Sequence, residues 1–223
     1  LTLVPERQSA HGLTGDVDAG NADDYAALAE ALYPVPSVNV TVRAVYTTDA
    51  PALQSNDGNG AWGTVLSEIQ ALRVAEDADD NYYGVVPTTY GSGIAGLGYI
   101  PSSRTSSYRA AIGWDKSNSR GGVAAHELGH NLGRFHAPCG GAANADPNYP
   151  YAGAAIGQWG FDPRNGQLKA PDCTDIMGYC GNQWISDYNF ELILDWLGRT
   201  VTPARSVLQP CLLVWGRVEH GAR

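Results

Sequence analysis

Three of the chain's five histidines fall within eleven residues, and a glutamate directly follows the first of them. His126 and His130 are one helical turn apart, so both imidazoles project from the same face and can hold one metal ion. Glu127 lies about 100° further round that helix. A carboxylate there is near the ion without being forced to bind it, which is where a general base belongs. This spacing predicts a hydrolytic metal centre.

His136 completes a set of three imidazoles only if the helix ends before it. A continued helix would carry His136 about 15 Å along the axis from His126, out of reach of the same ion. Gly133 can end the helix, because glycine adopts a left-handed turn without steric cost. Three neutral imidazoles leave a fourth tetrahedral position for water, so His126, His130 and His136 are predicted to bind a catalytic Zn²⁺. The alternative is a helix with ordinary polar histidines.

The elements that must position these residues alternate between strands and helices. Apolar periodicity predicts strands over 1–4, 38–46, 82–86, 96–100 and 108–114, a helix capped by Asn21 or Asp23, and helices over 62–75, 122–132 and 187–197. This order predicts an α/β fold with a mixed, mostly parallel twisted sheet and an active-site helix.

The chain is predicted to form one catalytic domain over 1–203. Its upper subdomain is expected over about 20–136 and an irregular lower subdomain over about 137–203. Residues 137–175 are rich in Gly, Pro, Asn and Asp and lose the apolar periodicity. Residues 204–223 form a tail. Within this tail, 211–218 is interpreted as a strand, which is the first strand of a following domain.

The motif from His126 to His136, followed by the chain's only methionine in Asp175–Tyr179, resembles the metzincin clan of zinc endopeptidases. The resemblance implies that Met177 forms a hydrophobic base beneath the zinc site and is not a ligand. It also implies a metzincin-like fold in which the lower subdomain contains this Met-turn.

Subfamily signals within the clan disagree. Residues 126–133 are similar to adamalysins, yet Ala137 stands where these usually carry aspartate. Met177 and Tyr179 instead resemble astacins and serralysins, in which the tyrosine is a movable fifth zinc ligand that stabilises the transition state. Tyr179 therefore either has that catalytic role or packs the turn, and the subfamily stays open.

The resemblance also implies where a protein substrate lies. The segment after the Met-turn, 181–185, is expected to line the pocket for the residue following the scissile bond, with Trp184 either capping it or packing in the core. The loop 159–162 resembles secreted bacterial metzincins that act on mucin-type glycoproteins. An edge strand holding the substrate backbone antiparallel is expected at Gly96, Leu97, Gly98 and Tyr99.

Four cysteines lie in the C-terminal half, and no pair has the CxxC spacing of a thiolate metal site. Two disulfides are favoured over such a site. The preferred pairing is Cys139–Cys173 with Cys180–Cys211, because the first bond would tie the loop after His136 back to the Met-turn.

A calcium ion is a second cofactor that the sequence allows. Oxygen ligands at alternate positions suit Ca²⁺, but no EF-hand spacing is present, and solvated turns with a helix cap are the alternative. The candidate ligands form two groups: Asp16, Asp18, Asn21, Asp23 and Asp24, and then Asp77, Asp79 and Asp80.

Composition narrows the class of protein. The chain has 223 residues, with 14 Lys+Arg against 23 Asp+Glu, so its net charge of −9 argues against nucleic acid as a partner. No apolar run is long enough to span a membrane. No signal peptide is recognisable, so we expect either that one has been removed or that the sequence is a piece of a longer chain. We expect a secreted monomer that acts on proteins or glycoproteins.

The function predicted from these features is that of a zinc endopeptidase with Glu127 as general base. A zinc amidase or deacetylase acting on a non-peptide amide is one alternative. A glycoprotein-binding module with a structural zinc is another, and the glutamate beside an open zinc position argues against it.

Overall fold

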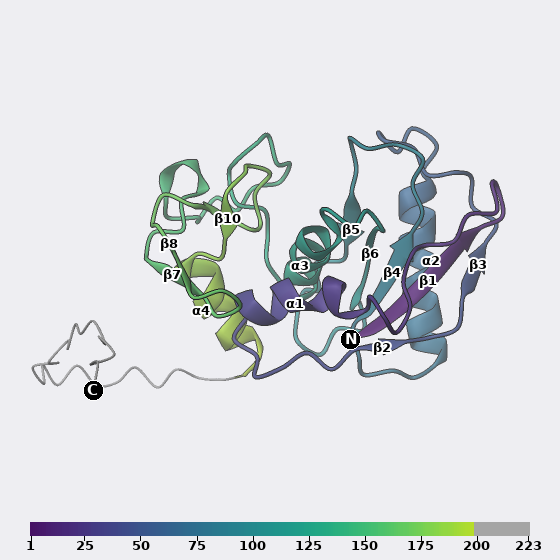
Figure 1. The fold of residues 1–223 in the computed structure, drawn as a ribbon, viewed down its shortest axis with the longest axis horizontal. Coiled ribbons are helices and arrows are strands. Elements are labelled where there is room, and N and C mark those ends of the chain that lie inside the picture. Colours follow the sequence, from purple (N-terminus) through teal and green to yellow (C-terminus); the bar gives the residue numbers. More distant parts are fainter. Residues whose placement is uncertain (199–223) are drawn as a thin grey trace, which may run out of the picture.

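The computed structural model describes residues 1–198 and shows a sheet layered between helices (Figure 1). The helices and strands are β1 (Thr2–Gln8), α1 (Asp23–Leu32), β2 (Thr41–Val42), β3 (Tyr46–Thr48), α2 (Ala61–Ala75), β4 (Tyr82–Val86), β5 (Gly96–Gly98), β6 (Ala110–Trp114), α3 (Arg120–Asn131), the 3-10 turn η1 (Ala152–Ala154), β7 (Gly160–Asp162), β8 (Gln167–Lys169), β9 (Thr174–Asp175), β10 (Gln183–Trp184) and α4 (Asp187–Trp196). The layered part is joined to a lower lobe with little regular structure, which follows α3 and contains η1, β7 to β10 and α4.

The main sheet has the order β2-β1-β4-β6-β5, and β3 also pairs with β1. All its pairings are parallel except that of β5, which runs antiparallel to β6 with Gly96 opposite Gly113. The predicted mixed, mostly parallel sheet is therefore confirmed. The short strand β5 lies at the edge, beside α3, the helix that carries the metal motif.

Both faces of the central strands are covered, which explains why β4 and β6 are buried along their whole length. On one face, Trp62, Val65 and Ile69 of α2 pack against the sheet. On the other face, α1 and α3 pack side by side, and Tyr25 and Ala124 join a second core (Figure 1). The helix with the metal motif therefore rests on the sheet.

The predicted strand over 38–46 is instead two short strands, β2 and β3. Both pair with β1, but β2 pairs with its beginning, at Thr2 and Leu3, and β3 with its end, from Glu6 to Gln8. Residues 43–45 between them belong to neither strand, so the alternating valines predicted a longer strand than the chain forms. The predicted cap of α1 is also wrong: Ala22 is the N-cap, without a side-chain hydrogen bond.

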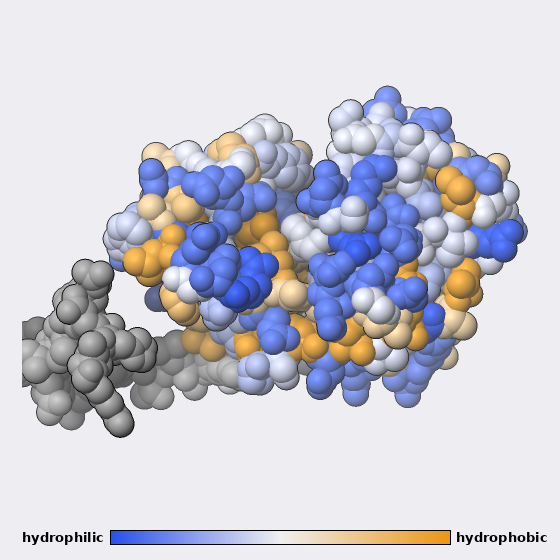
Figure 2. Space-filling model, in the orientation of Figure 1, coloured by the Kyte–Doolittle hydropathy of each residue, from blue (hydrophilic) through white to orange (hydrophobic). Residues whose placement is uncertain are grey.

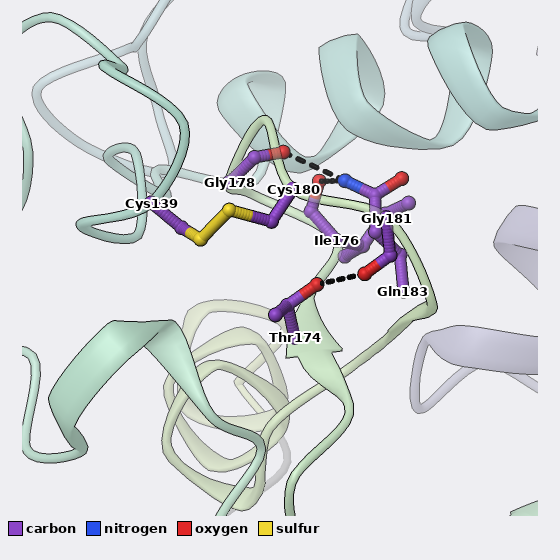
Figure 3. The surroundings of a disulfide bond; sticks show 7 residues. All are labelled: Cys139, Thr174, Ile176, Gly178, Cys180, Gly181 and Gln183. Atoms are coloured by element: carbon purple, nitrogen blue, oxygen red, sulfur yellow. Dashed lines mark hydrogen bonds between the residues drawn. A yellow bond between two sulfur atoms is a disulfide. The ribbon is translucent and has the colours of Figure 1, made fainter.

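The predicted disulfide pairing is wrong. Cys139 is bonded to Cys180, with the Cα atoms 5.7 Å apart (Figure 3). Cys139 cannot therefore pair with Cys173, nor Cys180 with Cys211. The Cys139 carbonyl accepts a hydrogen bond from the backbone N–H of Tyr179, which brings the neighbouring Cys180 within reach. The bond still ties the chain after His136 to the Met-turn.

Cys173 is a buried free thiol among the residues that the structure describes, and it accepts a hydrogen bond from the Asn182 amide at 3.3 Å. Cys211, the predicted strand 211–218 and the tail 204–223 lie outside the described residues. Within residues 1–198, no helix is both long and apolar enough to cross a membrane.

Arg120 fills the space between the carboxylates of the first proposed calcium cluster. Its guanidinium pairs with Asp24 and, at 3.3 Å, with Asp16. The Asp18 carboxylate accepts a hydrogen bond from the backbone N–H of Gly20, and the side-chain oxygen of Asn21 accepts one from the backbone N–H of Asp18. In the described part of the chain, a grouping of three or more side chains suited to a metal ion occurs only at the histidines.

Candidate metal centre

The three predicted histidines converge. One ring nitrogen from each of His126, His130 and His136 lies within 4.8 Å of the others, and the Nε2 atoms of His130 and His136 are 3.1 Å apart. Two of the residues come from α3 and the third from the chain that returns after it. The arrangement matches the donor set of a catalytic zinc site.

A backbone carbonyl holds each imidazole at its Nδ1 atom, the ring nitrogen opposite the converging Nε2. The Nδ1–H groups of the three imidazoles donate to carbonyl oxygens of Ile176 at 2.8 Å, Arg134 at 2.7 Å and Ala143 at 2.5 Å, respectively. Because a carbonyl can only accept, Nδ1 carries the proton in each neutral ring. The lone pairs of the three Nε2 atoms are therefore left for a metal ion.

The protonation and burial of these rings fit a bound cation. Burial lowers the pKa of His126 to about 4 and that of His130 to about 3, so both are neutral at pH 7. The Nε2 atom of His126 is buried and has no hydrogen-bond partner in the described residues. A divalent ion would satisfy this atom, which otherwise costs desolvation free energy.

Gly133 ends α3 as predicted. Its φ of +78° lies in the left-handed region, and the N–H of Arg134 donates back to the Gly129 carbonyl at 3.0 Å. A Cβ at this position would also lie 2.9 Å from the ring of Trp196 on α4. Glycine is therefore required twice here, for the turn that returns His136 and for close packing.

Met177 is fully buried directly beneath α3. A Cβ on Gly129 would lie 2.4 Å from its sulfur, so the helix backbone and the thioether are in close contact. The Asp175 carboxylate shapes this turn by accepting from the backbone N–H groups of Met177 at 2.7 Å and Ser186 at 2.9 Å. Asp175 was not predicted as a site residue, although it opens the Met-turn motif.

Tyr179 lies beside the imidazoles. Its hydroxyl is 3.1 Å from Nε2 of His136, and its ring centroid is 5.0 Å from that of His136. The side chain remains 56% exposed, so it has room to move. Burial, together with the charge of Glu127, raises the pKa of the phenol, which keeps it protonated at neutral pH.

Glu127 is buried on the face of α3 that meets β5. Desolvation raises the pKa of its carboxyl to about 8. The positive charge of a bound divalent ion beside it would act in the opposite direction and favour the carboxylate that a general base requires. Asn131 secures the junction between this helix and the edge strand, because its amide donates to the carbonyls of Tyr99 at 2.9 Å and Ala110 at 3.0 Å. Asn131 was missed by the sequence analysis, since nothing in its spacing distinguishes it from a polar surface residue.

The other predicted substrate residues fall in two places. Gly96, Leu97 and Gly98 form the edge strand, with Leu97 exposed. Trp184 is 3% exposed and lines a pocket of about 250 Å³ between the lower lobe and the end of α1, together with Trp159 and Phe161. Between the two lobes the surface is hollowed, at the upper centre of the view in Figure 2.

A sheet with an antiparallel edge strand, three convergent imidazoles and an adjacent glutamate define a zinc-dependent metallopeptidase. Sequence comparison agrees: the profile of the metallo-peptidase family M12 matches residues 21–186, and the chain belongs to that family. This confirms the metzincin clan predicted from the motifs.

Other comparisons are more distant. No curated protein matches the chain. Similar solved structures include a zinc-dependent peptidase from Methanocorpusculum labreanum (strain Z), at 15% identity and a TM-score of 0.37, covering 66% of this chain and 89% of that one. A structure described as a chaperone–substrate complex matches at 15% identity and a TM-score of 0.42, covering 89% of this chain but only 35% of that one.

Proposed function

We propose that this metallopeptidase is an endopeptidase that hydrolyses internal peptide bonds of extracellular proteins or glycoproteins, with Glu127 as its general base. The observation that carries the proposal is the placement of the Glu127 carboxylate beside an edge strand and next to three imidazoles whose Nε2 atoms converge. A binding module with a structural metal has no need of a carboxylate at that position.

Bound zinc would lower the pKa of a water molecule and polarise the substrate carbonyl. Glu127 then accepts the proton of the attacking water and passes it to the leaving amine nitrogen. The Tyr179 hydroxyl, 3.1 Å from Nε2 of His136, donates a hydrogen bond to the carbonyl oxygen as negative charge develops there. Met177 supports the rings from below.

The free edge of β5 supports an extended substrate. Its pairing with β6 uses one side, so the other side can pair with a peptide backbone by strand addition. Trp159 and Phe161, which are 64% and 58% exposed, add apolar surface near the pocket between the lower lobe and α1. The disulfide supports action in an oxidising compartment, hence outside the cell.

Glu127→Gln tests the mechanism because it keeps the side chain's shape and removes its basicity. We expect kcat/KM on casein to fall by roughly 10²–10⁴-fold while the zinc content stays at one ion per chain. Glu191→Gln, the same change on an exposed part of α4, serves as the control. Full activity of Glu127→Gln would contradict the mechanism. Zinc-loaded wild type that leaves casein, gelatin and mucin intact would favour a binding module.

A further inference from the structure

The Glu127 carboxylate is held by the shape of the edge strand. No hydrogen bond from the described part of the chain fixes it, and the side chain is only 6% exposed. A carboxylate without a hydrogen-bond partner is free to rotate unless neighbouring atoms confine it. The atoms that confine this one belong to β5.

Two glycines of β5 make room for this side chain. A Cβ on Gly96 would lie 2.6 Å from Oε1 and 2.7 Å from Cγ of Glu127, and 2.8 Å from Cγ1 of Val123. A Cβ on Gly98 would lie 2.8 Å from the backbone oxygen of Glu127 and 3.1 Å from its Oε2. Neither glycine has a positive φ, so the backbone conformation does not require glycine at either position.

The two contacts differ in what would have to move. At Gly96, the nearest atoms are side-chain atoms of Glu127 and Val123, which can rotate without displacing α3. At Gly98, the nearest atom is a helix carbonyl, and the Cβ of His130 follows at 3.3 Å, so an added methyl group pushes on the helix itself. An alanine at Gly96 is therefore accommodated by moving the carboxylate, while one at Gly98 disturbs the metal ligands.

We propose that Gly96 is a positioning residue for the general base: its missing side chain forms the space in which the Glu127 carboxylate is held. The proposal rests on the function proposed above. The strand β5 then has two roles: its free edge pairs with the substrate backbone, and its Gly96 positions the general base. Misplacement of a reacting group by about 1 Å can cost on the order of 10²-fold in rate.

The kinetic test compares Gly96→Ala with wild type. We expect kcat to fall about 10- to 100-fold, with KM and zinc content unchanged. Gly122→Ala is the matched control, since it adds the same methyl group to α3 where no atom lies within 4 Å, and it should keep wild-type kcat. In a Glu127→Ala background, which lacks Cγ and both carboxylate oxygens and so vacates the contact, Gly96→Ala should lower the residual kcat less than twofold.

A crystal structure of the zinc-loaded Gly96→Ala protein provides the second readout, which does not depend on activity. The Glu127 carboxylate should be displaced while β5 and the three imidazoles keep their places. A carboxylate that has not moved, or an equal loss of kcat in both backgrounds, would overturn the proposal. If wild type has no peptidase activity and the carboxylate is still displaced, the packing is as proposed and the proposed function is wrong.

Discussion

The side chain of Glu6 is completely buried in β1, and no described residue hydrogen-bonds to either of its carboxylate oxygens. It faces Glu68 on α2, and Tyr46 on β3 is its register partner. Burial, and secondarily the charge of Glu68, raise the pKa of Glu6 from 4.5 to about 8. The folded protein therefore holds this carboxyl protonated at neutral pH.

Glu6→Gln should change how stability depends on pH. Between pH 4.5 and 8 the unfolded chain releases the Glu6 proton while the folded chain retains it, so wild type loses stability as pH rises through this window. Glutamine is always neutral and removes that loss. We expect the melting temperature of Glu6→Gln, relative to wild type, to be several degrees higher at pH 8 than at pH 5, measured by calorimetry.

Glu191→Gln, the same substitution on an exposed part of α4, is again the control and is measured at both pH values. An equal effect of Glu6→Gln at pH 5 and pH 8 would mean that the buried carboxyl is already ionised in the folded state.

Residues whose chemistry depends on local spacing could be predicted from the sequence, and those that act through contacts distant in sequence could not. His126, His130 and the break at Gly133 follow from the helical repeat. The positions of Asp175 and Asn131 depend on a turn and a strand brought together by folding. The space that Gly96 leaves for Glu127 likewise exists only once β5 lies on α3.

At the scale of elements, long periodic segments were predicted well and short pairings poorly. The helix α2 and the strand β4 match their predicted bounds almost residue for residue, because their apolar patterns extend over complete faces. The strands β2 and β3 and the short pairs of the lower lobe contain two or three residues each. Strands this short are stabilised by pairing with neighbouring strands, and a sequence pattern of two or three residues is too short to predict them.

The disulfide Cys139–Cys180 acts at this scale, because it joins the segment after His136 to the Met-turn across a separation of 41 residues. Beside it, the Gln183 amide donates to the Gly178 carbonyl at 2.7 Å and Thr174 donates to Gly181 at 2.7 Å (Figure 3). The turn thus has its own hydrogen bonds, and the disulfide limits the freedom of the connecting loop.

Replacing Cys139 and Cys180 together by serine should destabilise the protein by about 2–4 kcal/mol, as expected for a loop of this length. Denaturant unfolding, with and without reductant, measures the loss. Reductant should lower the stability of wild type to that of the double variant and leave the double variant unchanged. Because both proteins keep Cys173, an effect of reductant on the variant would reveal a different bond.

At the scale of the whole molecule, the described part of the lower lobe shares its hydrophobic core with α1 and α3. Its buried residues Met177, Trp184 and Ile193 belong to a single cluster with Leu32 of α1 and Leu128 of α3. In Figure 1, α1 and α3 lie between the sheet and the lobe. The metal ligands lie at this junction, since two come from α3 and the third from the chain leading into the lobe.

Removal of the metal should therefore weaken the whole molecule in one step. An ion present at about 1,000 times its dissociation constant adds roughly 4 kcal/mol of stability, which for a chain of this size corresponds to a melting temperature about 10 °C higher. Calorimetry with a chelator should show a single transition at the lower temperature, and added zinc should restore the original one. Two separated transitions after chelation would mean that the lobe unfolds independently, contrary to its shared core.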